Sequence, residues 1–370
     1  MRKYLKYILV AFLISIIAFW FYLNREKGNP IENFNYFFNV FKEKYANFEV
    51  KGIDWQDIYN YYSEKVNEKT TDEELFNIFQ EFLTKLNDKH CRIYRFNQLC
   101  FSGFGLPSLN YFTILSFDYR VKTDDFSLKL IKKKYLNNSY EKSLRVYKLL
   151  EPPFGIRSIF TTGWLSDSIA YIHITEMSNK REGVHNSISD FCNKYRNAKG
   201  FIIDIRDNFG GWAIIPEDLA GRFTNKERIY AISRLRNPDS IFSFEEPEYW
   251  TIKPSCEKPI LNKPIVLLVN KNTASSAELF TLRMKTIPNV IVIGNTTAGI
   301  FGDMYNGKLP NGWNFGLPVR KTNDQNDVSL EDIGIIPDIL IENTKEDINN
   351  GKDKVIEYAI KYLSSGDKNK

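Results

Sequence analysis

A chain of 370 residues, of which 43% are hydrophobic and 15% aromatic, can bury one large core or two modest ones, so its composition excludes an intrinsically disordered protein. The net charge of +5 comes from basic residues spread along the chain, and we expect no nucleic-acid binding. Three histidines without zinc-helix spacing and four irregularly spaced cysteines predict neither a metal site nor a disulfide framework, and no cysteine pairing can be assigned.

The N-terminus, residues 1–28, is typical of a membrane-directing segment. Basic residues at positions 2, 3 and 6 precede a largely apolar run of 17 residues, Tyr7 to Leu23. The run is long for the apolar part of a signal peptide and lacks a small-x-small cleavage site, so we expect an uncleaved membrane anchor. The run is also at the short limit for a membrane span, which leaves a cleaved signal as the alternative. Both interpretations place the rest of the chain outside the cytoplasm.

Residues 29–91 have the pattern of a small helical domain. Apolar residues recur there at intervals of three and four, as expected for amphipathic helices. Thr71 followed by Glu74 predicts a capping box at the start of the last helix. His90 then lies just beyond the end of that helix.

The pattern changes twice more along the chain. Residues 92–165 contain short aromatic and β-branched runs broken by glycine and proline, which predict a β-rich connector. In residues 166–365, buried strands alternate with helices, which predicts an α/β domain with parallel strands and helical crossovers. Asn311-Gly312 predicts an antiparallel hairpin. The expected strands are 169–174, 201–205, 265–269 and 290–293, and the expected helices are 184–195, 216–223 and 276–287.

The segment from Pro264 to Phe280 combines a buried strand, a short turn and a helix that opens with two serines. A serine at a helix N-terminus lies beside free backbone N–H groups and the positive end of the helix dipole, which is the setting an oxyanion needs. Either Ser275 or Ser276 is therefore a candidate nucleophile. The alternative is that Ser275 only caps the helix.

A serine nucleophile needs a base, usually a histidine oriented by a carboxylate. His173 lies within a predicted strand and His185 early in a polar helix, so His90, next to Asp88 at the end of an element, is the best candidate. All three histidines precede the two serines, which excludes the chain order of the α/β-hydrolases. A Gly-x-Ser-x-Gly elbow is also missing from the sequence.

Two further segments accompany the serines. Asp204–Gly211 ends in two glycines after a strand, and its N–H groups could supply an oxyanion donor, with a tight strand-to-helix turn as the alternative. Glu331–Asp338 places adjacent carboxylates before a glycine turn, and the alternative there is a solvated loop.

Taken in order, these motifs resemble the C-terminal processing, or tail-specific, serine peptidases, whose relatives include the tricorn core and the interphotoreceptor retinoid-binding protein. The resemblance spans most of the chain after the N-terminal segment. The motifs that carry it are Gly52-Ile-Asp-Trp55, Leu86-x-Asp-x-His90, Ile203-Asp-x-Arg-x-Asn-x-Gly-Gly211, Thr273-Ala-Ser-Ser-Ala-Glu278, Gly294-x-Thr-Thr-x-Gly299, Leu309-Pro-Asn-Gly312 and Glu331-x-x-Gly-Ile-x-Pro-Asp338.

The resemblance implies a crotonase or ClpP-like catalytic domain that needs no cofactor. It places the nucleophile three residues before the glutamate of the helix, at Ser275. The branch with a Ser-Lys dyad has its lysine at the position of Ile300, whereas the tricorn-like branch uses a histidine and a glutamate that correspond to His90 and Glu331. The resemblance therefore implies a Ser-His-Glu triad, with Lys89 in place of the serine that precedes the tricorn histidine.

The function implied is an extracytoplasmic serine peptidase that hydrolyses proteins or peptides through an acyl-enzyme. The expected oxyanion donors are the N–H of Ser276 and one from Gly210 or Gly211. A segment with the length and glycine pattern of a PDZ domain is missing from the sequence, so recognition of substrate C-termini is not implied. Two alternatives stay open: a non-catalytic ligand- or peptide-binding protein of the same fold, and an esterase with the same triad.

Overall fold

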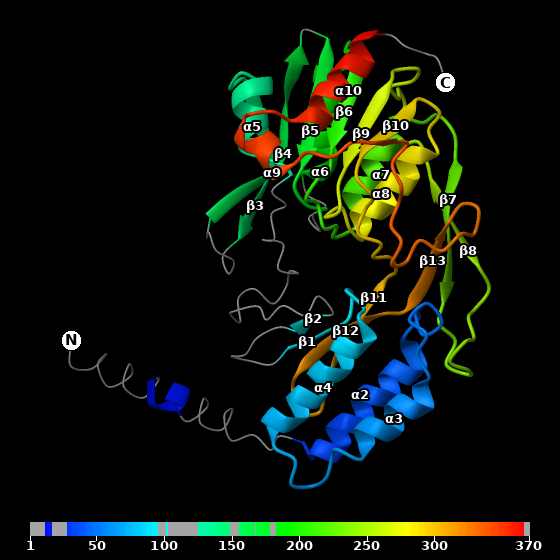
Figure 1. Ribbon diagram of the computed structural model, residues 1–370. Coiled ribbons are helices and arrows are strands. Elements are labelled where there is room, and N and C mark those ends of the chain that lie inside the picture. The colour runs from blue at the N-terminus through cyan, green and yellow to red at the C-terminus, as the bar shows by residue number, and fades with distance from the viewer. Residues whose placement is uncertain are drawn as a thin grey trace.

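The computed structural model describes residues 12–16, 28–94, 101–102, 125–148, 155–166, 168–177 and 183–365. Figure 1 shows two main parts, a lobe containing helices α2, α3 and α4 and an α/β domain. Much of the predicted β-rich connector lies outside the described residues, as does Cys100. The predicted fold class, an α/β fold preceded by a helical region, is confirmed.

The helical lobe consists of α2 (Pro30–Lys44), α3 (Trp55–Ser63) and α4 (Asp72–Leu86) around an aromatic core. The predicted capping box is present, because Thr71 and Glu74 bond each other's backbone N–H groups at the start of α4. Phe37 packs against Phe79 in a tilted arrangement, with ring centroids 4.3 Å apart. Aromatic side chains bury large apolar areas, so these rings account for much of the lobe's stability.

A four-stranded sheet completes the lobe, in the order β11 (Met304–Lys308), β12 (Asn314–Pro318), β1 (Arg92–Tyr94) and β2 (Phe101–Ser102). The predicted hairpin is confirmed, since β11 and β12 pair antiparallel and Gly312 in the turn has φ +90°. Trp313, Phe315 and Leu317 of this hairpin pack into the same core as the helices. The lobe therefore contains residues from both ends of the chain.

The α/β domain is built on a seven-stranded sheet. Five neighbouring strands are parallel and two at one end are antiparallel. The strand order is β14 (Ile339–Leu340), β10 (Val290–Gly294), β9 (Ile265–Val269), β6 (Gly200–Asp204), β5 (Ile169–Ile174), β4 (Gly155–Ser166) and β3 (Tyr140–Lys148).

Helices cover both faces of this sheet. One face packs against α6 (Val184–Lys194), α7 (Ile214–Gly221) and α8 (Ser276–Lys285), and the other against α10 (Lys354–Ser365). Alternate strand residues point to opposite faces, so Phe201 faces α6 whereas its neighbour Ile202 faces α10. Burial on both faces explains why the central strands are apolar along their whole length.

The remaining elements surround this core. A three-stranded antiparallel sheet has the order β13 (Arg320–Asp324), β7 (Arg228–Leu235) and β8 (Glu248–Ile252). Its strand β13 follows β12 directly, so this sheet connects the lobe to the α/β domain. Short helical turns lie at α5 (Leu128–Leu130), η2 (Ile131–Tyr135) and α9 (Lys345–Asn349).

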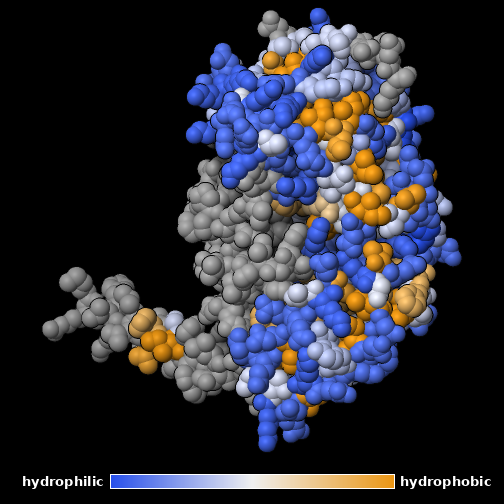
Figure 2. All heavy atoms as spheres, viewed as in Figure 1, coloured by the Kyte–Doolittle hydropathy of each residue, from blue (hydrophilic) through white to orange (hydrophobic). Residues whose placement is uncertain are grey.

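The molecular surface differs between the two parts. Figure 2 shows hydrophilic side chains over most of the helical lobe and apolar side chains in patches on the α/β domain. Ile336 and Leu340, close to the sheet edge formed by β14, are exposed. β14 itself has two residues, and so short an edge strand limits pairing with other chains.

Of the predicted N-terminal anchor, the structure describes residues 12–16, which are helical. Within the described ranges, no helix combines the length and apolar character needed to cross a membrane. Three of the four cysteines, Cys91, Cys192 and Cys256, are described, and all three are free thiols.

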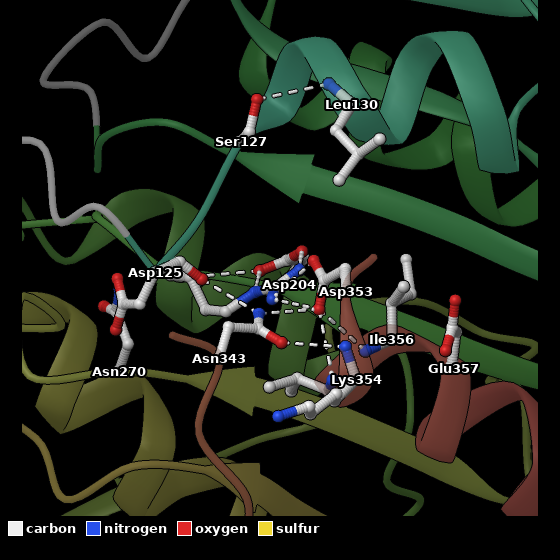
Figure 3. A network of polar contacts seen from close by, with 12 residues as sticks. Asp125, Ser127, Leu130, Asp204, Asn270, Asn343, Asp353, Lys354, Ile356 and Glu357 are labelled. Carbon is white, nitrogen blue, oxygen red and sulfur yellow. Dashed lines mark hydrogen bonds and ion pairs between the residues drawn. The ribbon is translucent and has the colours of Figure 1, made fainter. Parts of the chain in front are cut away.

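A buried ion-pair network joins the end of β6 to the start of α10 (Figure 3). Arg206 donates to Asp204 at 2.7 Å and to Asp353 at 2.9 Å, and all three side chains are shielded from solvent. Asp353 also accepts from the side chain of Asn343 and caps α10 by accepting the N–H of Ile356. The network therefore fixes where the chain leaves β6, immediately before the predicted glycine loop.

Replacing Arg206 with methionine should lower the free energy of unfolding by about 3–5 kcal/mol, because two buried carboxylates would lose their cation. Urea denaturation of the purified protein measures this change. The matched control is Arg234→Met, which removes a partly exposed bidentate pair with Asp327 and should cost below about 1 kcal/mol. Equal losses in the two variants would contradict the structural role of the buried pair.

Candidate active site

Ser275 lies at the junction between β9 and α8, one residue before the helix begins. Its backbone has φ 55° and ψ −123°, a region that costs residues other than glycine about 1–3 kcal/mol. Such strain persists only where the surroundings enforce it. The Ser275 N–H is held by two acceptors, the carbonyl of Ile300 at 3.1 Å and the carboxylate of Glu278 at 3.0 Å.

The Glu278 carboxylate organises the backbone around Ser275. Besides the Ser275 N–H, it accepts the N–H groups of Gly299 and Ile300 and the hydroxyl of Thr297. Burial raises the pKa of Glu278 to about 7, although these four donors act in the opposite direction. A carboxylate whose lone pairs all face donors is best satisfied when ionised, so these four donors favour the anionic form of Glu278, which holds the backbone of the serine turn.

His90 reaches Ser275 from the helical lobe. It follows the C-cap of α4, where Asn87 takes the left-handed conformation, and its own N–H donates to Asp88 at 2.8 Å. Tyr45 and Asn47 in turn donate to the other oxygen of the buried Asp88 carboxylate. This support brings Nε2 of His90 to 3.3 Å from Oγ of Ser275. The distance is long for an optimal hydrogen bond, as is common in proteins without bound substrate.

The other ring nitrogen of His90 and the carboxylate of Glu331 meet the same residue, Phe301. Nδ1 of His90 lies 3.0 Å from the carbonyl oxygen of Phe301, and Oε2 of Glu331 accepts the Phe301 N–H at 2.7 Å. A carbonyl can only accept, so Nδ1 carries the proton and Nε2 can accept from the serine hydroxyl. Glu331 thus supports the imidazole through the backbone of Phe301.

Burial shifts the pKa values of both His90 and Glu331. Desolvation lowers the pKa of His90 from its ordinary value of 6.5 to about 4, against the attraction of Asp88. Desolvation also raises the pKa of Glu331 well above its usual range, and the neighbouring Asp88 carboxylate acts in the same direction. Both shifts favour neutral side chains in the absence of substrate.

The glycine loop after β6 packs directly against the serine turn. A Cβ added to Gly210 would lie 2.6 Å from the Ser276 nitrogen, and one on Gly211 would lie 2.0 Å from the Met177 carbonyl. Both glycines also have positive φ, at 94° and 135°. Only glycine allows this approach of the two backbones.

Of the three expected oxyanion donors, one is already engaged. The Gly210 N–H donates to the side-chain oxygen of Asn208 at 2.9 Å. The N–H groups of Gly211 and Ser276 have no intramolecular acceptor among the described residues. The Ser276 hydroxyl donates instead to the carbonyl of Trp212 at 2.9 Å, which ties the glycine loop to the start of α8.

The other residues singled out in the sequence lie apart from Ser275 or take supporting positions. His173 on β5 is buried, and neither ring nitrogen has a hydrogen-bond partner among the residues that the structure describes. His185 on α6 lies 3.1 Å from Asp218. Ile300, at the position of the dyad lysine, braces Ser275 through its backbone. Lys89 donates to the carbonyl of Ala298 at 3.1 Å.

A cavity of about 550 Å³ lies away from this cluster, between α6, the end of α7 and the loop after β8. Its lining includes Cys192, Arg222 and Cys256 and none of the predicted site residues. Within the described residues, no group of histidine, cysteine or carboxylate side chains could hold a metal ion.

Sequence reasoning missed two contributors to the site. The Phe301 carbonyl has no sequence signature, because every residue carries one. Glu278 was identified as the glutamate of the serine motif, but its role as an acceptor for four donors was not. A glutamate three residues after the N-cap of a helix is a usual capping-box position, and that signal could have indicated its bond to the Ser275 N–H.

This α/β fold places a strained serine at a helix N-terminus opposite a histidine, an arrangement that serine peptidases use for nucleophilic catalysis. Comparison with known proteins agrees. A model of Peptidase family S41 matches residues 168–341, and one of the Tricorn protease C1 domain matches residues 29–84. These matches, together with the relatives below, support a place for the chain among the C-terminal processing serine peptidases.

The similar proteins cover the chain to different extents. The carboxyl-terminal-processing protease of Synechocystis is 24% identical over 47% of this chain and 38% of its own length. The tricorn protease of Thermoplasma acidophilum is 25% identical over 53% of this chain and 17% of its own length. The chain thus spans well under half of these curated relatives. A solved Parabacteroides merdae structure, described as a candidate peptidase, has a TM-score of 0.72 at 26% identity and covers 91% of this chain and 97% of its own.

Both buried histidines, His90 and His173, should stay neutral on acidification until about pH 4, because burial penalises the imidazolium form. In the unfolded chain they would take up protons near 6.5, so their contribution to stability is complete above that pH and is lost as the pH falls toward 4. NMR titration of the imidazole Cε1 protons, assigned with His90→Gln and His173→Gln, measures the two pKa values. Titration near 6.5 would show that the rings are hydrated.

Proposed function

We propose that this protein is a serine peptidase in which Ser275 is the nucleophile and His90 the general base. The observation that carries the proposal is the 3.3 Å approach of His90 Nε2 to the Ser275 hydroxyl, made from two different parts of the fold. A serine used only as a helix cap needs no histidine partner and no positive φ. The Ser-His geometry therefore favours catalysis over capping.

The proposed reaction passes through an acyl-enzyme. Nε2 of His90 takes the hydroxyl proton as Ser275 Oγ attacks the scissile carbonyl carbon, and the proton then passes to the leaving amine. A water molecule, deprotonated by the same nitrogen, hydrolyses the ester and restores the serine. The Phe301 carbonyl supports this cycle because it keeps the Nδ1 proton in place and orients the ring.

The tetrahedral intermediate needs donors for its oxyanion. The N–H groups of Gly211 and Ser276 are the proposed donors, because they lie where the glycine loop meets the helix N-terminus and have no other acceptor among the described residues. Gly210 contributes by shape, since its missing side chain permits the close packing. In a studied protease, one such donor is worth about 3–4 kcal/mol of transition-state stabilisation.

Glu331 completes the proposed triad as a positioning residue. Its carboxylate holds the Phe301 N–H at 2.7 Å, and the carbonyl of the same residue holds the imidazole. The branch with a Ser-Lys dyad is disfavoured, because Ile300 at the lysine position can neither accept nor donate a proton through its side chain. These observations support the tricorn-like assignment.

The proposed substrates are proteins or peptides outside the cytoplasm. The names of the relatives describe processing of carboxyl termini in those proteins, and similarity to them extends peptide hydrolysis to this chain as a hypothesis. Location outside the cytoplasm rests on the basic and apolar N-terminal residues, which we propose to be a membrane anchor.

Ser275→Ala should abolish labelling of the full-length protein by a fluorophosphonate probe and lower peptide turnover by a factor on the order of 10⁶. Ser276→Ala is the matched control, because it keeps the backbone N–H and loses only the hydroxyl bond to Trp212. Intact mass measures labelling, and quenched peptides and small esters measure turnover.

The possible outcomes separate the candidate functions. Labelling that survives in Ser275→Ala would reject this nucleophile. A folded wild type that is not labelled and hydrolyses neither substrate would favour a non-catalytic binding protein, and turnover of esters alone would identify an esterase.

Glu331→Gln should reduce kcat by less than about tenfold, because the amide oxygen of glutamine can still accept the Phe301 N–H. Glu331→Ala removes this acceptor and should cost about 10²-fold, the scale of a small misplacement of a catalytic group. Steady-state hydrolysis by the two variants measures the difference. A loss near 10⁴-fold in Glu331→Gln, as in a protease whose carboxylate bonds its histidine directly, would reject the indirect role.

A further inference from the structure

Lys51, in the turn between α2 and α3, directs its ammonium group toward the candidate site. The Lys51 side chain is 5% exposed, and that of its ion-pair partner Asp332 is 39% exposed. Its Nζ donates to the carbonyl of Asn87 at 2.9 Å and to the two carboxylate oxygens of Asp332 at 2.7 and 2.6 Å. The three acceptors match the three N–H donors of an ammonium group.

The two partners of Lys51 belong to the loops that carry His90 and Glu331. Asn87 is the left-handed C-cap of α4, three residues before His90, and Asp332 directly follows Glu331 with φ 61°. The two loops come from opposite ends of the chain. The Lys51 ammonium group therefore joins the loop that carries His90 to the loop that carries Glu331.

We propose that Lys51 is a positioning residue that holds the His90 and Glu331 loops in register and completes the site only when the helical lobe is docked on the α/β domain. The inference rests on the proposed peptidase function. Lys51 needs no contact with substrate in this role. It acts through the backbone of Asn87 and the carboxylate of Asp332.

A second ion pair that joins the helical lobe to the rest of the structure provides a comparison for the Lys51–Asp332 pair. Lys321 of β13 pairs with Glu49 at 3.0 Å, but these side chains are 26% and 69% exposed. Exposed pairs contribute little to stability, and this one touches neither loop of the site. Lys51 differs from it in burial, in its bond to a backbone carbonyl and in its position between the two loops.

Lys51 also acts on the charges of the site. The charged and titratable groups around His90 are Asp88, Cys91 and Arg92 on its own segment, Tyr45 at the C-cap of α2, and Glu331 and Asp332 from the C-terminal segment. Burial is the largest influence on the pKa of both His90 and Glu331, and the Lys51 cation lowers both pKa values. Removing the cation should therefore raise the pKa of His90.

The test compares full-length wild type with Lys51→Met, Lys321→Met and Asp332→Asn. Asparagine suits this last position because it tolerates positive φ. Lys51→Met should lower kcat at least about tenfold with a smaller change in KM, because the misplaced groups act in the chemical step. Lys321→Met should keep wild-type values. A double-mutant cycle of Lys51→Met with Asp332→Asn should be strongly non-additive.

The pH readout separates positioning from simple stabilisation. In Lys51→Met the NMR titration of His90 and the acid limb of kcat/KM should both move to higher pH, whereas Lys321→Met should leave both unchanged. Unchanged titration together with unchanged kcat would overturn the inference. If wild type itself is not labelled by the fluorophosphonate, the peptidase proposal fails, and the NMR titration still decides whether Lys51 acts on His90.

Discussion

The structure depends above all on the docking of the helical lobe against the α/β domain, because the two groups that would react come from opposite sides of that contact. His90 and Ser275 are 185 positions apart in sequence and 3.3 Å apart in space. A hydrogen bond weakens steeply beyond this distance, so a shift of the lobe by a fraction of its own width would separate the pair. Three features keep the lobe in place and so maintain the distance between His90 and Ser275. They are the aromatic core, the hairpin from the C-terminal half and the Lys51 contact.

Much of the fold could be predicted because its signals are local. The bounds of β5 and β9 agree with prediction to the residue, since strands buried on both faces read as unbroken apolar runs between turns. The Asn311-Gly312 turn is also a local signal. The pairing of β12 with β1 could not be predicted, because contacts between residues more than 200 positions apart leave no trace in periodicity.

The candidate site could likewise be predicted only in part. Sequence motifs contain its side chains, but the contacts among them arise from the fold. Ser275, His90 and Glu331 were proposed from motif positions, and the structure brings the first two together and joins the third to them through Phe301. The groups that determine their chemistry are backbone carbonyls, backbone N–H groups and buried carboxylates such as Glu278. Their effect arises from burial, which strengthens each interaction and penalises each unpaired charge, and burial is a property of the whole fold.

The hairpin of β11 and β12 has a consequence for biosynthesis. A ribosome makes the helices of the lobe first, yet Trp313 and Phe315, which fill the lobe's core, are made more than 200 residues later. The core of the lobe therefore stays incomplete while most of the chain is synthesised. The proposed nucleophile and base are likewise kept from meeting until nearly the end of synthesis. Such a chain remains inert while it is being made, because the last third of the polypeptide is required to finish the first.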